Sequence, residues 1–343
     1  MLGWLRSWSS STFLRLGLLG ALAAGFSCGL AVPGAAAPEA VPNPAAGPAG
    51  TLVVLPDDGS DQLLGALAAA RRRVWLEVYM LTDARVLGAL AAAHAGGVEV
   101  RVLLEPSPYG DAGANQAAFL ALQQDSIDVR WFAVPGGLAH VKLLLVDDRA
   151  LVLTANLTQA GLGRNREYAY VDSAQADVSR AESVFQADAI GAEPRSAPAD
   201  TRIIVSPSDA RPRLEAALDA ATTAVAVEIE EISDPELVAR LLAAHARGVA
   251  VSVVVPGANR SVATDQAVAA LADGGVGVRV MDTPTLHAKA MIIDDAVAYL
   301  GSVNFTRASL DDNREVGVLL ADTTVVARMS ATLRHDWAGA GAW

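Results

Sequence analysis

The sequence contains very little cysteine, lysine and histidine. Its 343 residues include one cysteine, Cys28, and five histidines, and all but two of the 26 basic residues are arginine. A single cysteine excludes a disulfide within the chain. The fold must therefore depend on its apolar core, and a chain of this length with 52% hydrophobic residues can build one.

Positive charge is scarce as well. The 38 acidic residues outnumber the 26 basic ones, which gives a formal net charge of −12. Proteins that bind DNA without sequence preference use clustered basic side chains, and the only basic run in this chain is Arg71–Arg73. The composition therefore argues against nucleic acid as a partner.

The N-terminus has the layout of an export signal. Basic residues precede an apolar run from Leu16 to Val32, and small residues follow. This order is typical of a secretory signal peptide, which we assign to residues 1–37, followed by a Pro- and Ala-rich linker at 38–50. We expect a secreted, periplasmic or cell-envelope protein. The alternative is a membrane anchor formed by the same segment, although a span needs about 20 apolar residues.

The remaining chain is a repeat of one unit. Residues 51–190 and 201–343 carry corresponding segments, and Glu77 and Glu228 are one matching pair. A stretch rich in Pro, Ala and charge at 191–200 indicates a linker between the two copies. Internal similarity of this kind predicts two halves with the same architecture.

Within each half, β-branched runs alternate with Ala- and Leu-rich helical patterns, such as residues 84–95 and 235–246. Strands that alternate with helices are typical of βα units. We therefore predict an α/β fold of two similar βα-repeat halves. Their sheets should be mixed, mainly parallel and flanked by helices, and the halves should pack about a pseudo-twofold axis.

Each half contains the motif His, any residue, Lys, four residues, Asp. The residues are His140, Lys142 and Asp147 in the first half and His287, Lys289 and Asp294 in the second. Side chains two apart on a strand project from the same face, so each motif presents an imidazole and an ammonium together. Both lysines of the chain lie in these motifs, which indicates a need for a compact charge with rotatable donors rather than the planar fork of arginine.

Polar residues downstream of each motif repeat too. They are Thr154, Asn156 and Glu167 in the first half and Ser302, Asn304 and Glu315 in the second. With these residues the chain resembles the phospholipase D superfamily, whose signature is the His-Lys-Asp motif followed by a Gly-Ser-x-Asn element and a later Asn-x-Glu. The first half departs from this pattern, because Leu153-Thr154 replaces the Gly-Ser found at Gly301-Ser302.

Two imidazoles supply both groups that cleavage of a phosphodiester needs, a nucleophile and a proton donor. We expect His140 and His287 to face one phosphate. The resemblance implies that the first histidine is the nucleophile, whereas the sequence alone does not distinguish them. It also implies the other roles. The predicted catalytic residues are His140, His287, Lys142, Lys289, Asp147, Asp294, Glu167 and Glu315, and the predicted phosphate-binding residues are Asn156, Asn304, Thr154 and Ser302.

More specifically, Lys142 and Lys289 would stabilise phosphate oxygens together with the asparagines. Glu167 and Glu315 would each hold an imidazole nitrogen. Asp147 and Asp294 begin Asp-Asp pairs that suit turns, and we expect them to brace the motifs. Neither pair has a third ligand at metal-binding spacing. We predict no metal and no cofactor.

The leading hypothesis is a secreted phospholipase D-like phosphodiesterase that hydrolyses or transfers phospholipid head groups through a phosphohistidine. It would act as a monomer that touches the membrane surface transiently. The alternatives are a nuclease of the same superfamily, a cardiolipin synthase-like transferase, and a non-catalytic binding protein with this fold. Arg164, Arg166, Arg307 and Arg314 are the arginines nearest the motifs, and we expect them to reach no more than one or two phosphates.

Overall fold

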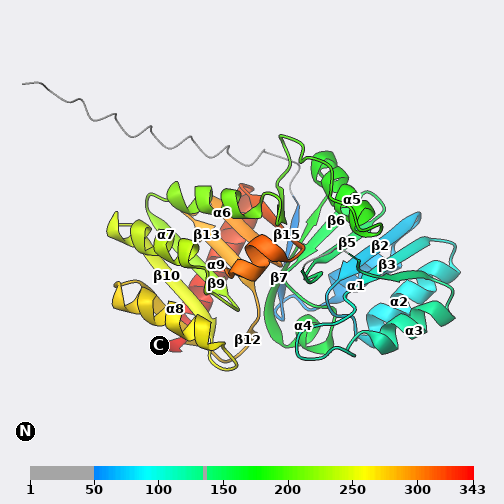
Figure 1. Ribbon diagram of the computed structural model, residues 1–343, viewed down its shortest axis with the longest axis horizontal. Helices are drawn as coiled ribbons and strands as arrows, with labels where there is room; N and C mark the ends of the chain where they lie inside the picture. Colours follow the sequence, from blue (N-terminus) through cyan, green and yellow to red (C-terminus); the bar gives the residue numbers. More distant parts are fainter. Residues whose placement is uncertain (1–49, 134–136) are drawn as a thin grey trace, which may run out of the picture. The chain divides into compact units, whose positions relative to one another are not determined.

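The computed structural model describes residues 50–133 and 137–343. The predicted signal peptide and nearly all of the linker at 38–50 lie outside the described residues. Figure 1 shows two α/β halves in chain order. Among the described residues, no helix combines the length and the apolar character that a membrane span requires.

The first half contains seven strands and five helices within the described residues. They are β1 (Thr51–Leu55), α1 (Asp61–Ala68), β2 (Arg73–Val78), α2 (Ala84–Ala95), β3 (Glu99–Leu104), α3 (Gln116–Gln124), β4 (Asp128–Trp131), β5 (Lys142–Val146), β6 (Arg149–Leu153), α4 (Gln159–Gly163), β7 (Asn165–Asp172) and α5 (Gln175–Asp188).

The second half repeats this order with small additions. Its elements are β8 (Ile203–Ser206), α6 (Ala210–Asp219), β9 (Ala224–Ile229), α7 (Pro235–Ala246), β10 (Ala250–Pro256), α8 (Val262–Asp273), β11 (Gly277–Met281), β12 (Thr285–Leu286), β13 (Lys289–Ile293), β14 (Val297–Gly301), the π-helix η1 (Ala308–Asp312), β15 (Glu315–Leu320), α9 (Thr323–Gly339) and β16 (Gly341–Ala342). Helices α2 and α7 coincide with the predicted helices. Both begin after an aspartate, Asp83 or Asp234, that accepts a backbone hydrogen bond in the first turn.

Each half is built on one mixed sheet, as predicted. The strand order is β1-β7-β6-β5-β2-β3-β4 in the first sheet and β16-β11-β10-β9-β13-β14-β15-β8 in the second, and β12 pairs with β7 of the first sheet. The expectation that parallel pairs predominate is wrong, because β5, β6 and β7 pair antiparallel, as do β13, β14 and β15. The Asp-Asp pairs account for two of these antiparallel pairs, β5–β6 and β13–β14. They turn the chain back at once between neighbouring strands, with Asp147 and Asp294 at positive φ, whereas a parallel connection needs a longer crossover.

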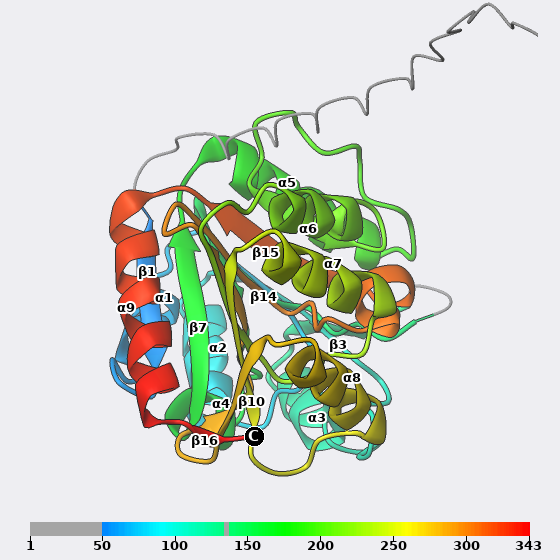
Figure 2. The same ribbon diagram turned by 90° about the vertical axis from the view of Figure 1, so that its left-hand side faces the viewer.

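The two sheets share a central core. Leu143 and Leu145 of β5 face this core, and Leu144 and Val146 face the outer core beneath α1 to α3. The motif strand is therefore buried on both sides, which accounts for its unbroken apolar run. The shared core also holds β13 and residues of α5 and α9, such as Phe185 and Met329. Figure 2 shows α9 beside β1, which it contacts.

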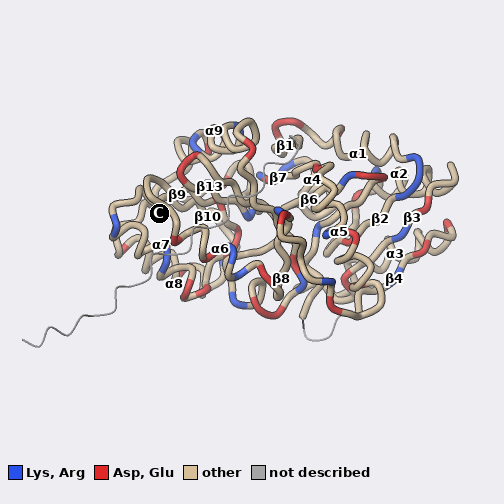
Figure 3. Tube along the Cα trace, turned by 90° about the horizontal axis from the view of Figure 1, so that it is seen from above, with Lys and Arg blue, Asp and Glu red and all other residues tan. Residues whose placement is uncertain are grey.

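Charged residues of both signs are interspersed along most of the described chain, as Figure 3 shows, and Arg71–Arg73 is the one run of consecutive basic residues in the sequence. Several arginines are instead paired with acids in the interior. Arg166, Arg202 and Arg314 are each no more than 3% exposed and each contacts a buried aspartate. Part of the positive charge is thus unavailable to an external polyanion.

Candidate active site

The segment before each motif histidine crosses to the other half. Ala139 forms a parallel bridge with Arg314, and the His140 amide donates to the Arg314 carbonyl at 3.0 Å. In the second half, β12 pairs in parallel with the start of β7, and the His287 amide donates to the Arg166 carbonyl at 3.4 Å. Each histidine is therefore placed beside the strand that carries the glutamate of the opposite half.

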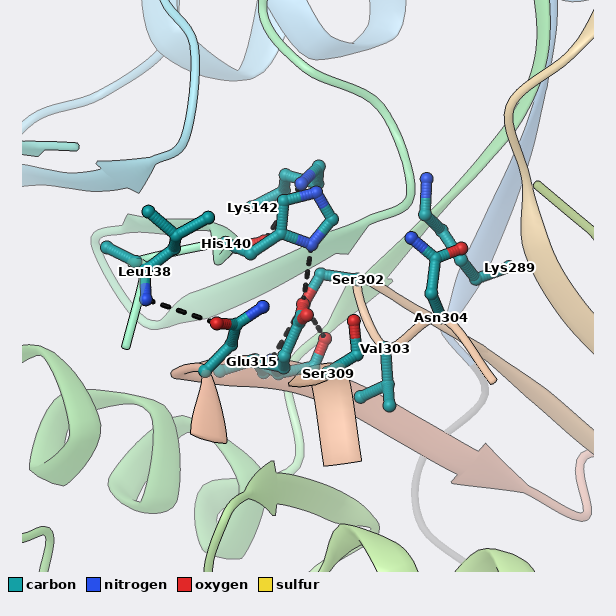
Figure 4. A network of polar contacts seen from close by, with 12 residues as sticks. Leu138, His140, Lys142, Lys289, Ser302, Val303, Asn304, Ser309 and Glu315 are labelled. Carbon is teal, nitrogen blue, oxygen red and sulfur yellow. Dashed lines mark hydrogen bonds and ion pairs between the residues drawn. The ribbon is translucent and has the colours of Figure 1, made fainter. Parts of the chain in front are cut away.

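The side chains of the two halves contact each other in the same reciprocal way. Nδ1 of His140 lies 2.8 Å from Oε2 of Glu315, as Figure 4 shows. Nδ1 of His287 lies 2.7 Å from Oε1 of Glu167. Both glutamates have no exposed surface, whereas 13% of the His140 side chain and 19% of the His287 side chain are exposed. The reciprocal contacts are those of two halves related by a twofold arrangement. They leave the outer nitrogen of His140 for substrate, whereas that of His287 lies 3.4 Å from Glu230.

The two lysines lie beside these histidines and are buried. Lys142 Nζ donates to the His140 carbonyl at 2.8 Å and lies 5.1 Å from the centre of the Tyr79 ring. Lys289 Nζ donates to the His287 carbonyl at 2.7 Å and also binds the carboxylate of Glu230. Their exposed fractions are 1% and 0%. Two ammonium groups held in a nearly closed site provide the positive charge that a phosphate requires.

Burial and these charges shift the pKa values of the site. Burial, Lys142 and Lys289 hold the pKa of His140 well below its usual 6.5, which favours a neutral imidazole. Burial and Lys289 lower the pKa of Lys142 to about 7. Burial raises the pKa of Glu315 to about 8, although Lys142 opposes this shift. Perturbed values of this kind are typical of functional sites.

The structure places the side chains of Thr154 and Ser302 beside the two glutamates. Both hydroxyls are fully buried. Thr154 donates to Oε2 of Glu167 at 2.5 Å, and Ser302 accepts from the Val316 amide at 2.9 Å and favours the ionised form of Glu315. They lie at the ends of β6 and β14, next to the strands that carry the glutamates, and they contact these carboxylates, so their binding of phosphate stays a prediction.

Asn156 and Asn304 remain candidates for phosphate binding. Asn304 donates to Glu230 at 3.4 Å, and Figure 4 shows it next to Lys289, which binds the same carboxylate oxygen. The side-chain oxygen of Asn156 is buried and has no hydrogen-bond partner within the described residues. A buried polar atom of this kind is expected to meet a ligand or an ordered water.

The structure also separates Asp147 and Asp294 from the histidines. Asp147 lies five residues beyond Lys142, at the far end of β5, which corresponds to about 16 Å along a strand. Its carboxylate accepts the backbone amides of Arg71, Arg72 and Arg73, with a shortest distance of 2.7 Å. Asp294 accepts those of residues 222–224 in the same way. These aspartates hold the turns at the ends of their motif strands, and their predicted catalytic role stays a prediction.

Two of the four arginines near the motifs point away from the site. Arg166 donates to both oxygens of Asp336 at 2.6 and 3.0 Å, and Arg314 donates to Asp188 at 3.0 Å. Because each pair joins one half to the other, these arginines hold the halves together and are not available to steady a phosphate.

The sequence interpretation missed three residues that shape the site. Tyr79 packs edge to face on His140, with ring centres 4.7 Å apart, and Glu230 contacts His287 and Lys289. Glu105 accepts the Ala139 amide at 2.7 Å and so fixes the segment that leads to His140. The repeat alignment contains a signal for the first two, because positions 79 and 230 correspond when Glu77 is matched with Glu228.

Within residues 50–133 and 137–343, no group of three or more His, Cys, Asp or Glu side chains is arranged to hold a metal ion. The chemistry available to the described site is that of paired imidazoles, each backed by a carboxylate, with two ammonium groups beside them. This set suits cleavage of a phosphodiester by nucleophilic and acid–base catalysis.

Comparison with known proteins agrees with this geometry. The family described as "Cardiolipin synthase, PLD-like domain" matches the chain twice, at residues 63–189 and 214–337. The chain belongs to this phospholipase D-like family. The resemblance to the phospholipase D superfamily inferred from the two motifs is thereby confirmed.

Curated relatives of this phospholipase D-like protein include two cardiolipin synthases A. The one from Pseudomonas entomophila (strain L48) is 31% identical over 127 residues, which are 36% of this chain and 26% of the relative. The one from Pseudomonas aeruginosa (strain LESB58) is 32% identical over 122 residues, 35% of this chain and 25% of the relative. The matched region thus spans about a quarter of the length of these relatives.

Solved structures share the fold. Phosphatidylserine synthase from Haemophilus influenzae Rd KW20 superposes with a TM-score of 0.60 at 13% identity, over 81% of this chain and 83% of its own. Polyphosphate kinase from Porphyromonas gingivalis gives a TM-score of 0.66 at 15% identity, over 83% of this chain and 50% of its own. At these identities the likeness supports the two-half architecture alone.

Proposed function

We propose that the protein transfers a phosphatidyl group from a phospholipid to an alcohol through a phosphohistidine. We prefer the cardiolipin synthase-like transferase to the secreted hydrolase because the curated relatives are cardiolipin synthases. The observation that carries the proposal is the reciprocal pairing of His140 with Glu315 and of His287 with Glu167. It makes one site from two halves, with an oriented imidazole on each side.

In the first step, Nε2 of His140 attacks phosphorus while its Nδ1–H stays hydrogen-bonded to Glu315. A neutral His140 suits this role, since its pKa is held well below the usual value. The bond from phosphorus to the alcohol oxygen breaks, and His287 donates a proton to that oxygen. His287 suits the acid role because it lies between two carboxylates, Glu167 and Glu230.

In the second step, His287 takes the proton of the acceptor alcohol, whose oxygen attacks the phosphohistidine and releases His140. Lys142, Lys289 and the two asparagines hold the phosphate oxygens throughout. Water in place of the alcohol gives hydrolysis, so the two reactions differ only in the acceptor. Export through residues 1–37, action at a membrane surface and a monomeric state belong to this proposal as well.

The reaction is tested with purified protein and vesicles of phosphatidylglycerol or phosphatidylethanolamine, with and without added glycerol. Transfer yields a new diester or cardiolipin, and hydrolysis yields phosphatidic acid. We expect transfer products in excess, and loss of both products in His140→Ala. Formation of phosphatidic acid alone would support the hypothesis of a hydrolase. Cleavage of DNA without lipid turnover would support the alternative of a nuclease.

The roles of the histidines are tested with bis(p-nitrophenyl) phosphate, whose leaving group needs no proton. His287→Ala should release a burst of p-nitrophenol close to one equivalent of enzyme and then stall, because His140 still attacks but the intermediate is not resolved. His140→Ala should show no burst. A burst in His140→Ala but not in His287→Ala would reverse the assignment.

A further inference from the structure

The two halves differ at one position of the site. In the first half Tyr79 follows β2 and faces His140 and Lys142 with an uncharged ring. In the second half Glu230 follows β9 and faces His287 and Lys289 with a carboxylate. Because the neighbouring His and Lys are equivalent, this exchange of an aromatic ring for an acid is a difference in charge at one phosphate-binding surface.

The Glu230 carboxylate occupies the donors that the second half would offer to a phosphate. One oxygen binds Lys289 Nζ and accepts from Asn304 Nδ2 at 3.4 Å, and the other lies 3.4 Å from Nε2 of His287. Carboxylate and phosphate oxygens are both acceptors for such groups. A substrate phosphate that reaches these donors must therefore displace Glu230 or share them with it.

Protonation does not release Glu230 from Lys289, because its carboxylate stays ionised. Burial opposes its ionisation, but His287 and Lys289 outweigh burial and hold its pKa well below the usual value. Its side chain is 29% exposed, so it lies at the open side of the site and not beneath it. When an anion takes Lys289, the displaced carboxylate remains negative, next to a second negative charge, and requires a new cationic partner.

We infer that Glu230 is a specificity-determining residue, which is displaced from the phosphate subsite most readily by phosphoesters whose alcohol carries an ammonium group. The phosphate takes over Lys289 and Asn304, and the ammonium replaces Lys289 as the partner of Glu230. This exchange conserves the ion pairs of the site, whereas a phosphoester without a cation leaves Glu230 unpaired. The inference rests on the proposed function for its lipid context, where it assigns the donor a cationic head group.

The test uses two soluble ligands that differ only in the ammonium, phosphoethanolamine and ethyl phosphate. Their affinities are measured by isothermal titration calorimetry for the full chain and for Glu230→Gln. We expect the unaltered protein to bind phosphoethanolamine about tenfold or more tightly than ethyl phosphate. In Glu230→Gln this ratio should fall below about threefold, because ethyl phosphate gains affinity once no carboxylate competes for Lys289.

Glu231→Gln is the matched control. This variant removes the carboxylate of the residue next to Glu230. Glu231 contacts Asn304 through its backbone amide and not through its side chain. The ligand preference should persist in this variant. If Glu231→Gln abolishes the preference as fully as Glu230→Gln, general charge and not Glu230 is responsible, and the inference is overturned.

The comparison of ligands on the unaltered protein needs no variant, so a folding defect in Glu230→Gln does not remove the test. Equal affinity for the two ligands, or binding of neither, overturns the inference. Weaker binding of ethyl phosphate by folded Glu230→Gln overturns it too, because Glu230 would then support the subsite. Ligand discrimination without phosphatidyl transfer refutes only the proposed function, and transfer without discrimination refutes only the role of Glu230.

Discussion

Replacement of Glu315 by glutamine isolates the contribution of one half to the histidine of the other. Glu315 is fully buried and lies 2.8 Å from Nδ1 of His140. A hydrogen bond to a charged group contributes about 1.5–3 kcal/mol, and each 1.36 kcal/mol is a factor of ten in rate, so lost orientation alone gives about 10 to 150-fold. A glutamine amide also allows the proton to move to Nε2, the attacking atom. Loss of the correct tautomer extends the expected decrease in kcat to about 10⁴-fold.

The fold should not be weakened by the same change. Burial raises the pKa of Glu315 to about 8, so the structure disfavours its ionised form at neutral pH and a neutral amide removes that cost. We expect Glu315→Gln to unfold in urea at the same or a higher midpoint than the unaltered protein. A large loss of activity with unchanged or greater stability is the signature of a catalytic carboxylate in a buried site.

Glu228→Gln provides the matched control. Glu228 is equally buried, and burial raises its pKa to about 8 as well, but its carboxylate accepts from the Tyr168 hydroxyl at 2.7 Å rather than from an imidazole. This variant should keep most of its activity. The assay is steady-state turnover of bis(p-nitrophenyl) phosphate and of phospholipid vesicles. A decrease in kcat of less than about threefold in Glu315→Gln would contradict the role of Glu315. An equal decrease in Glu228→Gln would contradict it too.

Three further outcomes are expected. Arg166→Met should lower the free energy of unfolding by about 3–5 kcal/mol, because it leaves Asp336 buried without its partner, and adding Asp336→Leu should recover much of this loss in urea titrations. Asp147→Ala should cost about 2 kcal/mol through its backbone hydrogen bonds yet leave the turnover of the folded fraction near normal; a selective loss of kcat would return it to the catalytic residues. The stability of Glu228→Gln relative to the unaltered protein should rise between about pH 5 and 8, since native Glu228 binds a proton that the unfolded chain has released. A difference in stability that is independent of pH would contradict the raised pKa.

Much of the fold was predictable because the evidence for it is local. The periodicity of residues 84–95 and 235–246 determines helices α2 and α7, with an aspartate at each start. The balance of parallel and antiparallel pairs was not predictable from the alternation of strands and helices. The direction of a strand pair depends on whether the two strands are joined by a hairpin. The short turns at Asp147 and Asp294 need a positive φ, which is a property of the folded turn.

The sequence by itself determined which residues we propose as the reacting groups of this protein. Two copies of one motif and only two lysines identify His140, His287 and their ammonium neighbours, since residue type and spacing along a strand are enough to place such side chains together. Only the tertiary structure decided which groups these residues meet. Glu315 is 175 residues from His140, and they meet because the inner faces of both sheets bury one core, which brings the strand of one half to the histidine of the other. The same packing buries Arg166 and Arg314 and places Glu230 on Lys289. No local pattern encodes these contacts, because they form between surfaces that become neighbours only after each half has folded.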